Sequence, residues 1–144
     1  MTPAGSAEAK DKLILIVDDD DGQQEFISLA LRTEGFRIEQ AFDGREALRK
    51  VRQLLPDLIL LDLMFPRHGG HEITVQLQSE PTADIPIIII SGYSKDHLTK
   101  AMICEEPNVV DFMSKPLRAD RLIPKIHEIL DTRPSKRAKR PART

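Results

Sequence analysis

The stretch Leu13-Ile14-Leu15-Ile16-Val17-Asp18-Asp19-Asp20-Asp21 joins an apolar run directly to a row of carboxylates. Three further apolar runs also end on a residue that can bind metal or phosphate. They are 58–61 before Asp62, 87–90 before Ser91, and 109–114 before Lys115. Short, β-branched runs of this kind are typical of buried parallel strands. Because ligands bind beyond the carboxyl ends of the strands in an open α/β sheet, we expect these side chains to meet in one crevice.

Segments with helical periodicity separate these strands. The predicted helices cover 23–34, 43–55, 71–79, 94–105 and 118–130, and a weaker strand covers 36–42. We expect the helical apolar stripes to include Phe26 in the first helix and Leu54 and Leu55 in the second. Each interval between strands is long enough for a right-handed crossover. The alternation predicts an α/β fold: a doubly wound, three-layer sandwich with a five-stranded parallel sheet and five helices.

The composition indicates one soluble domain. The chain has 144 residues, enough to bury a core. No apolar run approaches the roughly 20 residues of a membrane helix, and the first residues lack an apolar signal region. The single cysteine, Cys104, has no internal disulfide partner, and we expect a buried structural thiol. These features favour a cytoplasmic protein without membrane insertion.

The net charge of −2 hides an asymmetry between the two parts of the chain. Residues 132–144 contain six basic residues and no acid, so the remainder carries −8. Two prolines and the lack of apolar residues predict a disordered basic tail over 132–144. We therefore expect a flexible segment over 1–11, a domain over 12–131, and no foldable output domain after it.

Three interpretations of the basic tail remain open. It could be an inert, solvated end, an electrostatic arm for an acidic protein, or a weak contact to nucleic acid. No helix-turn-helix or aromatic platform accompanies it, so specific DNA binding is not predicted.

The residues at the strand ends predict phosphoryl chemistry. Asp18, Asp19 and Asp62 would repel one another at close range and have raised pKa values unless a cation neutralised them. Hard oxygen ligands with room for water and phosphate suit Mg²⁺. A carboxylate there can attack phosphorus, while Lys115 and Ser91 contact the phosphoryl oxygens. Taken singly, each motif also has a structural explanation, since an aspartate run is often a helix N-cap or a solvated turn.

These motifs resemble the receiver domain of two-component response regulators, over nearly all of residues 12–130. The resemblance rests on four stretches: Leu15-Ile16-Val17-Asp18-Asp19-Asp20, Pro56-Asp57-Leu58-Ile59-Leu60-Leu61-Asp62-Leu63-Met64-Phe65-Pro66, Ile90-Ser91-Gly92, and Asp111-Phe112-Met113-Ser114-Lys115-Pro116-Leu117. It implies a flavodoxin-like fold with strand order 2-1-3-4-5.

The resemblance also implies roles for individual residues. Asp62 would be the phosphoacceptor and a metal ligand. Asp19 would bind Mg²⁺ directly and Asp18 through water, with the backbone carbonyl of Met64 completing the protein ligands. Mn²⁺ could replace Mg²⁺.

Further roles concern the phosphoryl group and the switch. Lys115 and Ser91 would hold the phosphoryl group. Ser91 and Phe112 would form the switch, with Phe112 following Ser91 as phosphate draws it inward. The Lys115–Pro116 peptide bond is expected to be cis.

Two positions would modulate the lifetime of the phosphorylated form. Met64 and Tyr93 lie two residues beyond Asp62 and Ser91. In similar receivers, the residues at these two positions flank the path of the attacking water. One departure from the family concerns the loop after Asp62, which usually ends in an Asp-Gly pair. Gly69-Gly70 stands there instead, and this change removes no ligand.

Two other classes of function compete with this interpretation. In a haloacid-dehalogenase-like phosphohydrolase, Asp18 would be the nucleophile and Asp20 the general acid. However, Gly22 stands where that family carries Thr or Val, and no acidic pair follows Lys115. The other class is a binding module with a receiver fold and no phosphorylation.

We therefore expect a stand-alone response regulator, a phosphoacceptor signalling protein rather than an enzyme with a separate substrate. A sensor histidine kinase or a histidine phosphotransfer protein would donate the phosphoryl group to Asp62 in a phosphorelay. The phosphorylated form would bind a downstream protein through the face formed by the fourth helix, fifth strand and fifth helix, or form a homodimer.

Overall fold

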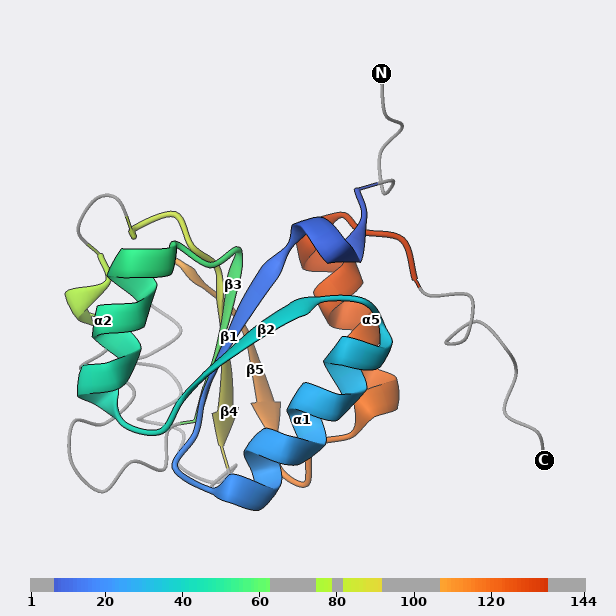
Figure 1. Cartoon of the computed structure of the whole chain (residues 1–144), viewed down its shortest axis with the longest axis horizontal. Helices are drawn as coiled ribbons and strands as arrows, with labels where there is room; N and C mark the ends of the chain where they lie inside the picture. The colour runs from blue at the N-terminus through green and yellow to red at the C-terminus, as the bar shows by residue number, and fades with distance from the viewer. Residues whose placement is uncertain (1–6, 63–74, 79–81, 92–106, 135–144) are drawn as a thin grey trace.

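A parallel β-sheet forms the middle of the computed structural model, which describes residues 7–62, 75–78, 82–91 and 107–134 (Figure 1). The five strands are β1 (Leu13–Val17), β2 (Arg37–Ala41), β3 (Leu58–Asp62), β4 (Ile87–Ser91) and β5 (Val109–Ser114). Their order is β2-β1-β3-β4-β5, and every neighbouring pair is parallel. The predicted sheet and strand order are confirmed.

Helices cover both faces of this sheet. The helices are α1 (Asp21–Thr33), α2 (Gly44–Leu54), α5 (Ala119–Leu130) and the short 3-10 helix η1 (Ala9–Asp11). Helices α1 and α5 lie on one face and α2 lies on the other (Figure 1). The helices predicted over 71–79 and 94–105 lie almost entirely outside the described residues, so the count of five helices stays a prediction.

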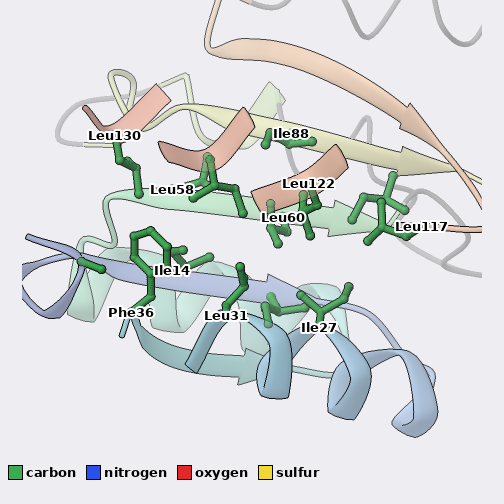
Figure 2. Packing of buried hydrophobic residues seen from close by; sticks show 14 residues of the cluster. Ile14, Ile27, Leu31, Phe36, Leu58, Leu60, Ile88, Leu117, Leu122 and Leu130 are labelled. Atoms are coloured by element: carbon green, nitrogen blue, oxygen red, sulfur yellow. The ribbon is translucent and has the colours of Figure 1, made fainter. Parts of the chain in front are cut away.

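The three central strands are buried along their whole length, whereas the edge strands β2 and β5 are only partly buried. Because side chains alternate along a strand, each central strand supplies both faces of the core. Ile14, Leu58 and Ile88 pack toward α1 and α5, as Figure 2 shows for that cluster. Leu15 and Ile59 belong to the second cluster, on the α2 side. A strand buried on both faces explains the continuous apolar runs in the sequence.

Polar residues set the limits of the first two helices. Asp20 caps α1 by accepting a hydrogen bond from Gln23 N at 2.7 Å, and Asp43 caps α2 through Glu46 N at 2.7 Å. Gly35 ends α1 at a φ of 103°, a conformation that favours glycine. These limits agree with the predicted helix start at Asp43 and the predicted stop at Gly35.

The predicted apolar stripes of α1 and α2 are partly wrong. Phe26, Leu54 and Leu55 are exposed by 44%, 41% and 48%. In α1 the polar residues Gln24 and Ser28 are buried instead, in line with Ile27 and Leu31 at helical spacing. Both polar side chains form hydrogen bonds with strand residues, so the buried face of α1 is set by polar contacts as well as apolar packing.

Contacts in the structure continue past residues 12 and 131, which are the predicted limits of the domain. Ala7 N donates to Asp131 O at 3.3 Å, and Arg133 N donates to Ala7 O at 3.1 Å. Thr132 is 4% exposed, and its hydroxyl lies 2.6 Å from His127 Nδ1. These contacts join the segment before η1 to the segment after α5, whereas the flexible segment and the basic tail stay predictions, since residues 1–6 and 135–144 lie outside the described residues.

Helices long and apolar enough to cross a bilayer do not occur among the described residues.

Candidate metal and phosphoryl-transfer site

Four neighbouring strands bring the predicted site residues to one edge of the sheet. Asp18 and Asp19 directly follow β1, and Asp62 is the last residue of β3. Ser91 is the last residue of β4, and Lys115 directly follows β5. Since β1, β3, β4 and β5 are adjacent and parallel, their carboxyl ends lie side by side.

Three carboxylates form a compact cluster at this edge. One oxygen from each of Asp18, Asp19 and Asp62 lies within 4.8 Å of the other two. Asp18 and Asp62 are buried, whereas Asp19 is exposed. The cluster therefore has a buried floor and an open side through which water or a phosphate can reach it.

Asp18 has an incompletely satisfied carboxylate. Its Oδ1 accepts a hydrogen bond from Asp20 N at 2.9 Å, but its buried Oδ2 has no hydrogen-bond partner among the described residues. Burial, opposed by that backbone hydrogen bond and reinforced by the charge of Asp62, raises the pKa of Asp18 to about 7. Near neutral pH both the protonated and the charged form of Asp18 are therefore populated.

Lys115 pairs with the central carboxylate of the cluster. Its Nζ lies 2.9 Å from Asp62 Oδ2, and the Lys115 side chain is 27% exposed against 3% for Asp62. Burial acts to lower the pKa of Lys115, but the hydrogen bond and charge of Asp62, with the charges of Asp18 and Asp20, outweigh it and raise this pKa. Lys115 thus stays an ammonium group that can neutralise oxygens brought to Asp62.

Ser91 and Phe112 lie on the neighbouring strands β4 and β5. Ser91 is 3% exposed, and its backbone carbonyl accepts a hydrogen bond from Lys115 N at 2.8 Å. Phe112 is opposite Ile89 in the β4–β5 register and packs against the α2-side core. The Lys115–Pro116 peptide bond is cis, as predicted.

Several predicted positions lie outside the described residues. They are the possible ligand Met64, the modulating residue Tyr93, the pair Gly69-Gly70 and the single cysteine Cys104.

Gln24 of α1 was missed by the sequence analysis. Its side-chain amide reaches the carbonyl oxygens of Ile16, Asp18 and Ala41, next to the acidic loop, which is residues 18–20 between β1 and α1. A glutamine in line with Ile27 and Leu31 on an amphipathic helix was the available signal, since a buried polar side chain needs a partner.

The donor set fits a hard divalent cation. Carboxylate oxygens from Asp18, Asp19 and Asp62 are the ligands that Mg²⁺ prefers, and the exposed side leaves room for water. The unpartnered Oδ2 of Asp18 is a buried acceptor that a cation, directly or through a bound water, would satisfy.

Comparisons with known proteins point to one protein family. The family model for the response regulator receiver domain matches residues 14–127. The DNA-binding response regulator MtrA of Mycolicibacterium smegmatis is 34% identical over 113 residues, which are 78% of this chain and 48% of that protein. The chain thus spans about half the length of this relative, and nothing about the other half carries over.

Solved structures share the fold. A CheY-like receiver domain protein from Methanospirillum hungatei has a TM-score of 0.76 and 28% identity, covering 83% of this chain and 94% of that one. The receiver domain of the sensor histidine kinase PA1611 from Pseudomonas aeruginosa has a TM-score of 0.75 and 24% identity, covering 83% and 97%. From the match over residues 14–127, with the sheet order and the acidic cluster described above, this chain belongs to the response regulator receiver domain family.

Proposed function

We propose that this receiver accepts a phosphoryl group on Asp62 in the presence of Mg²⁺ and thereby changes its affinity for a partner protein. The observation that carries the proposal is the contact between Lys115 Nζ and Asp62 Oδ2, beside two further carboxylates. A buried carboxylate held between an ammonium group and a cation-binding cluster is suited to attack on phosphorus.

In the proposed reaction an oxygen of Asp62 attacks the phosphorus of a phosphohistidine on a kinase or phosphotransfer protein. The new O–P bond forms as the N–P bond breaks, and the electron pair of that bond stays on the histidine nitrogen, which can take a proton from solvent. Lys115 stays charged throughout and neutralises the phosphoryl oxygens, and the Ser91 hydroxyl is proposed to orient them.

Asp18, Asp19, Asp62 and the carbonyl of Met64 would hold the metal ion, with Asp18 acting through water. When bound, Mg²⁺ supplies positive charge that offsets the repulsion between the carboxylates and the incoming phosphate. The receiver domain of PA1611, which shares this fold, has a magnesium ion coordinated in its active-site cleft, and that observation supports the proposal.

The proposed output surface includes β5 and α5. Beside these two elements lies a hollow of about 600 Å³, whose lining includes Phe112, Pro116, Arg121 and Lys125. Because Phe112 lines this hollow, a movement of its ring on phosphorylation would change the shape offered to a partner. A downstream protein or a second copy of the chain could be that partner.

The test is phosphorylation by acetyl phosphate. Purified protein with Mg²⁺ should gain one acid-labile phosphoryl group by mass spectrometry, and Asp62→Asn or chelation of the metal should remove it. Asp57→Asn is the matched control, since Asp57 immediately precedes the same strand at its opposite end. Undiminished labelling of Asp62→Asn would contradict the proposal and favour chemistry at Asp18, as in the phosphohydrolase alternative.

The switching step has a separate test. A partner that binds the protein equally with and without the phosphoryl mimic beryllofluoride would favour a binding module without phosphorylation control.

The proposed lifetime control depends on Met64 and Tyr93. A bulky apolar side chain and an aromatic ring near the path of the in-line water would slow hydrolysis of the aspartyl phosphate. Tyr93→Ala should therefore shorten the half-life measured by loss of label, and an unchanged or longer half-life would contradict shielding by this ring.

A further inference from the structure

Gln24 lies in α1 next to the acidic loop and is 1% exposed. The two hydrogens of its Nε2 are shared among three backbone carbonyl oxygens: Ile16 O at 2.9 Å, Ala41 O at 2.8 Å and Asp18 O at 3.1 Å. One side chain therefore links helix α1 to the carboxyl ends of both β1 and β2.

The orientation of this amide follows from its surroundings. The three neighbouring atoms are carbonyl oxygens, which only accept hydrogen bonds, so the donating nitrogen has to face them. A flipped amide would place its oxygen against three acceptors, which the hydrogen-bond network rules out. The buried Oε1 of Gln24 then has no hydrogen-bond partner among the described residues.

The buried amide of Gln24 is satisfied at its nitrogen but, among the described residues, not at its oxygen. Nε2 satisfies backbone carbonyl oxygens that a methionine of similar length would leave without this donor, but Oε1 stays buried without a partner in the described part of the chain, which costs free energy. Conflicts of this kind between a residue and its local environment tend to occur at functional sites.

The contacts of Gln24 bear directly on the position of Asp18. Gln24 Nε2 holds the Asp18 carbonyl, and Asp20 N holds Asp18 Oδ1 at 2.9 Å. Ala41 O accepts a hydrogen bond from Asp18 N at 3.0 Å and another from Gln24 Nε2. Hydrogen bonds thus fix both the N–H and the carbonyl of Asp18. Its Oδ2 has no hydrogen-bond partner in the described part of the chain.

We infer that Gln24 is a positioning residue for the divalent cation, holding Asp18 and the start of the acidic loop in the metal-binding arrangement. The inference rests on the proposed function, because it assumes that the cluster binds Mg²⁺. Without the three hydrogen bonds, repulsion among the carboxylates would move the loop apart, and Mg²⁺ would have to reassemble it. Partners outside the coordination shell typically change metal affinity by about 10-fold to 100-fold.

The test compares Gln24→Met with Gln40→Met. Gln40 also joins α1 to β2, through Nε2 to Ser28 Oγ at 2.8 Å, but it does not touch the acidic loop. Calorimetric titration with Mg²⁺ should show affinity lowered about tenfold or more in Gln24→Met and changed less than about twofold in Gln40→Met. At saturating Mg²⁺ the rate of acetyl phosphate labelling should return close to that of the wild type, because the bound cation restores the loop.

Each outcome decides the inference. Unchanged Mg²⁺ affinity in a Gln24→Met protein, even one with a lower melting temperature, would show that Gln24 is structural only. If Gln24→Met does not fold, Gln24→Asn takes its place under the same criterion, since its amide is one methylene too short to reach all three carbonyls. Wild-type protein that fails to bind Mg²⁺ would overturn the proposed function as well, whereas equal binding by wild type and variant overturns this inference alone.

Discussion

Two buried carboxylates at opposite ends of the sheet, Glu34 and Asp18, differ in their hydrogen-bond partners. At the amino end Glu34 Oε1 lies 2.7 Å from His127 Nε2, and His127 Nδ1 lies 2.6 Å from the Thr132 hydroxyl. The ring of Phe36 packs at 5.2 Å from that of His127. At the carboxyl end Asp18 keeps a buried oxygen without a partner in the described residues, and burial raises its pKa to about 7.

This difference separates a structural carboxylate from a functional one. A carboxylate that has protein partners contributes to one folded arrangement and needs no ligand. A carboxylate that is crowded by other acids, with one buried oxygen left without a partner, is destabilising until a proton or a cation arrives. The four predictions below test this contrast, starting from the largest expected effect.

Removing the histidine at the amino end should cost the most stability. His127→Ala leaves Glu34 without this partner and opens a cavity beside Phe36, so the free energy of unfolding should fall by about 3 kcal/mol or more. Urea unfolding followed by circular dichroism measures this change. Leu29→Ala is the control, since Leu29 is 67% exposed and its loss should matter by no more than about 0.5 kcal/mol. A loss below about 1 kcal/mol in His127→Ala would mean that the His127 contacts are not structural.

Magnesium should stabilise the carboxyl end. At a concentration 100 times its dissociation constant, Mg²⁺ should raise the free energy of unfolding by about 2.7 kcal/mol, because it binds only the folded cluster. At one fixed Mg²⁺ concentration the gain should be larger at about pH 8 than at about pH 6, since below about pH 7 a proton on Asp18 competes with the cation and weakens its binding. Thermal unfolding at both pH values measures the gain. Equal stabilisation at both would argue against Asp18 as the competing group.

Asp18→Asn should stabilise the metal-free protein, which is the opposite of the effect at His127. The folded pKa of Asp18 is about 7 and its ordinary value is 3.8, so the folded state retains a proton that the unfolded chain has lost. Stability therefore falls as pH rises from about 4 to about 7 and is lowest above that window. Removing the charge should raise stability at about pH 8 by roughly 1–3 kcal/mol and flatten the pH dependence. Asp21→Asn, at an exposed position in the first turn of α1, is the control. A destabilised Asp18→Asn protein would contradict the contrast between a structural carboxylate at Glu34 and a functional one at Asp18.

Two truncations locate the end of the domain. Ending the chain after Asp131 removes the buried Thr132 hydroxyl beside His127 and the Arg133–Glu8 ion pair at 3.0 Å. This truncation should lower stability by about 1–2 kcal/mol, mainly through Thr132, since an exposed ion pair contributes little. Ending the chain after Pro134 should change stability by less than about 0.5 kcal/mol. Equal melting temperatures for the two truncated proteins would place the boundary back at Asp131. Both should still be labelled at Asp62, at the opposite end of the sheet.

The sequence alone was sufficient for the sheet and for the residues that converge on the site. Runs such as Leu58–Leu61 are apolar along their length because the central strands are buried on both faces, and this pattern is local. Once parallel strands are recognised, their carboxyl ends share one edge. Asp18, Asp62 and Lys115 then had to lie together, as the 2.9 Å contact between Lys115 and Asp62 shows.

Only the tertiary structure decided how polar side chains pair across long distances in the chain. Glu34 meets His127 across 93 positions, and Leu13 N meets Asp57 Oδ2 across 44, at 2.8 Å. Gln24 reaches carbonyls at the ends of two strands, and Ala7 pairs with the segment after α5. Apolar burial is non-directional and leaves a periodic trace in the sequence, whereas a hydrogen bond depends on two atoms meeting within about 3 Å, which no local pattern encodes.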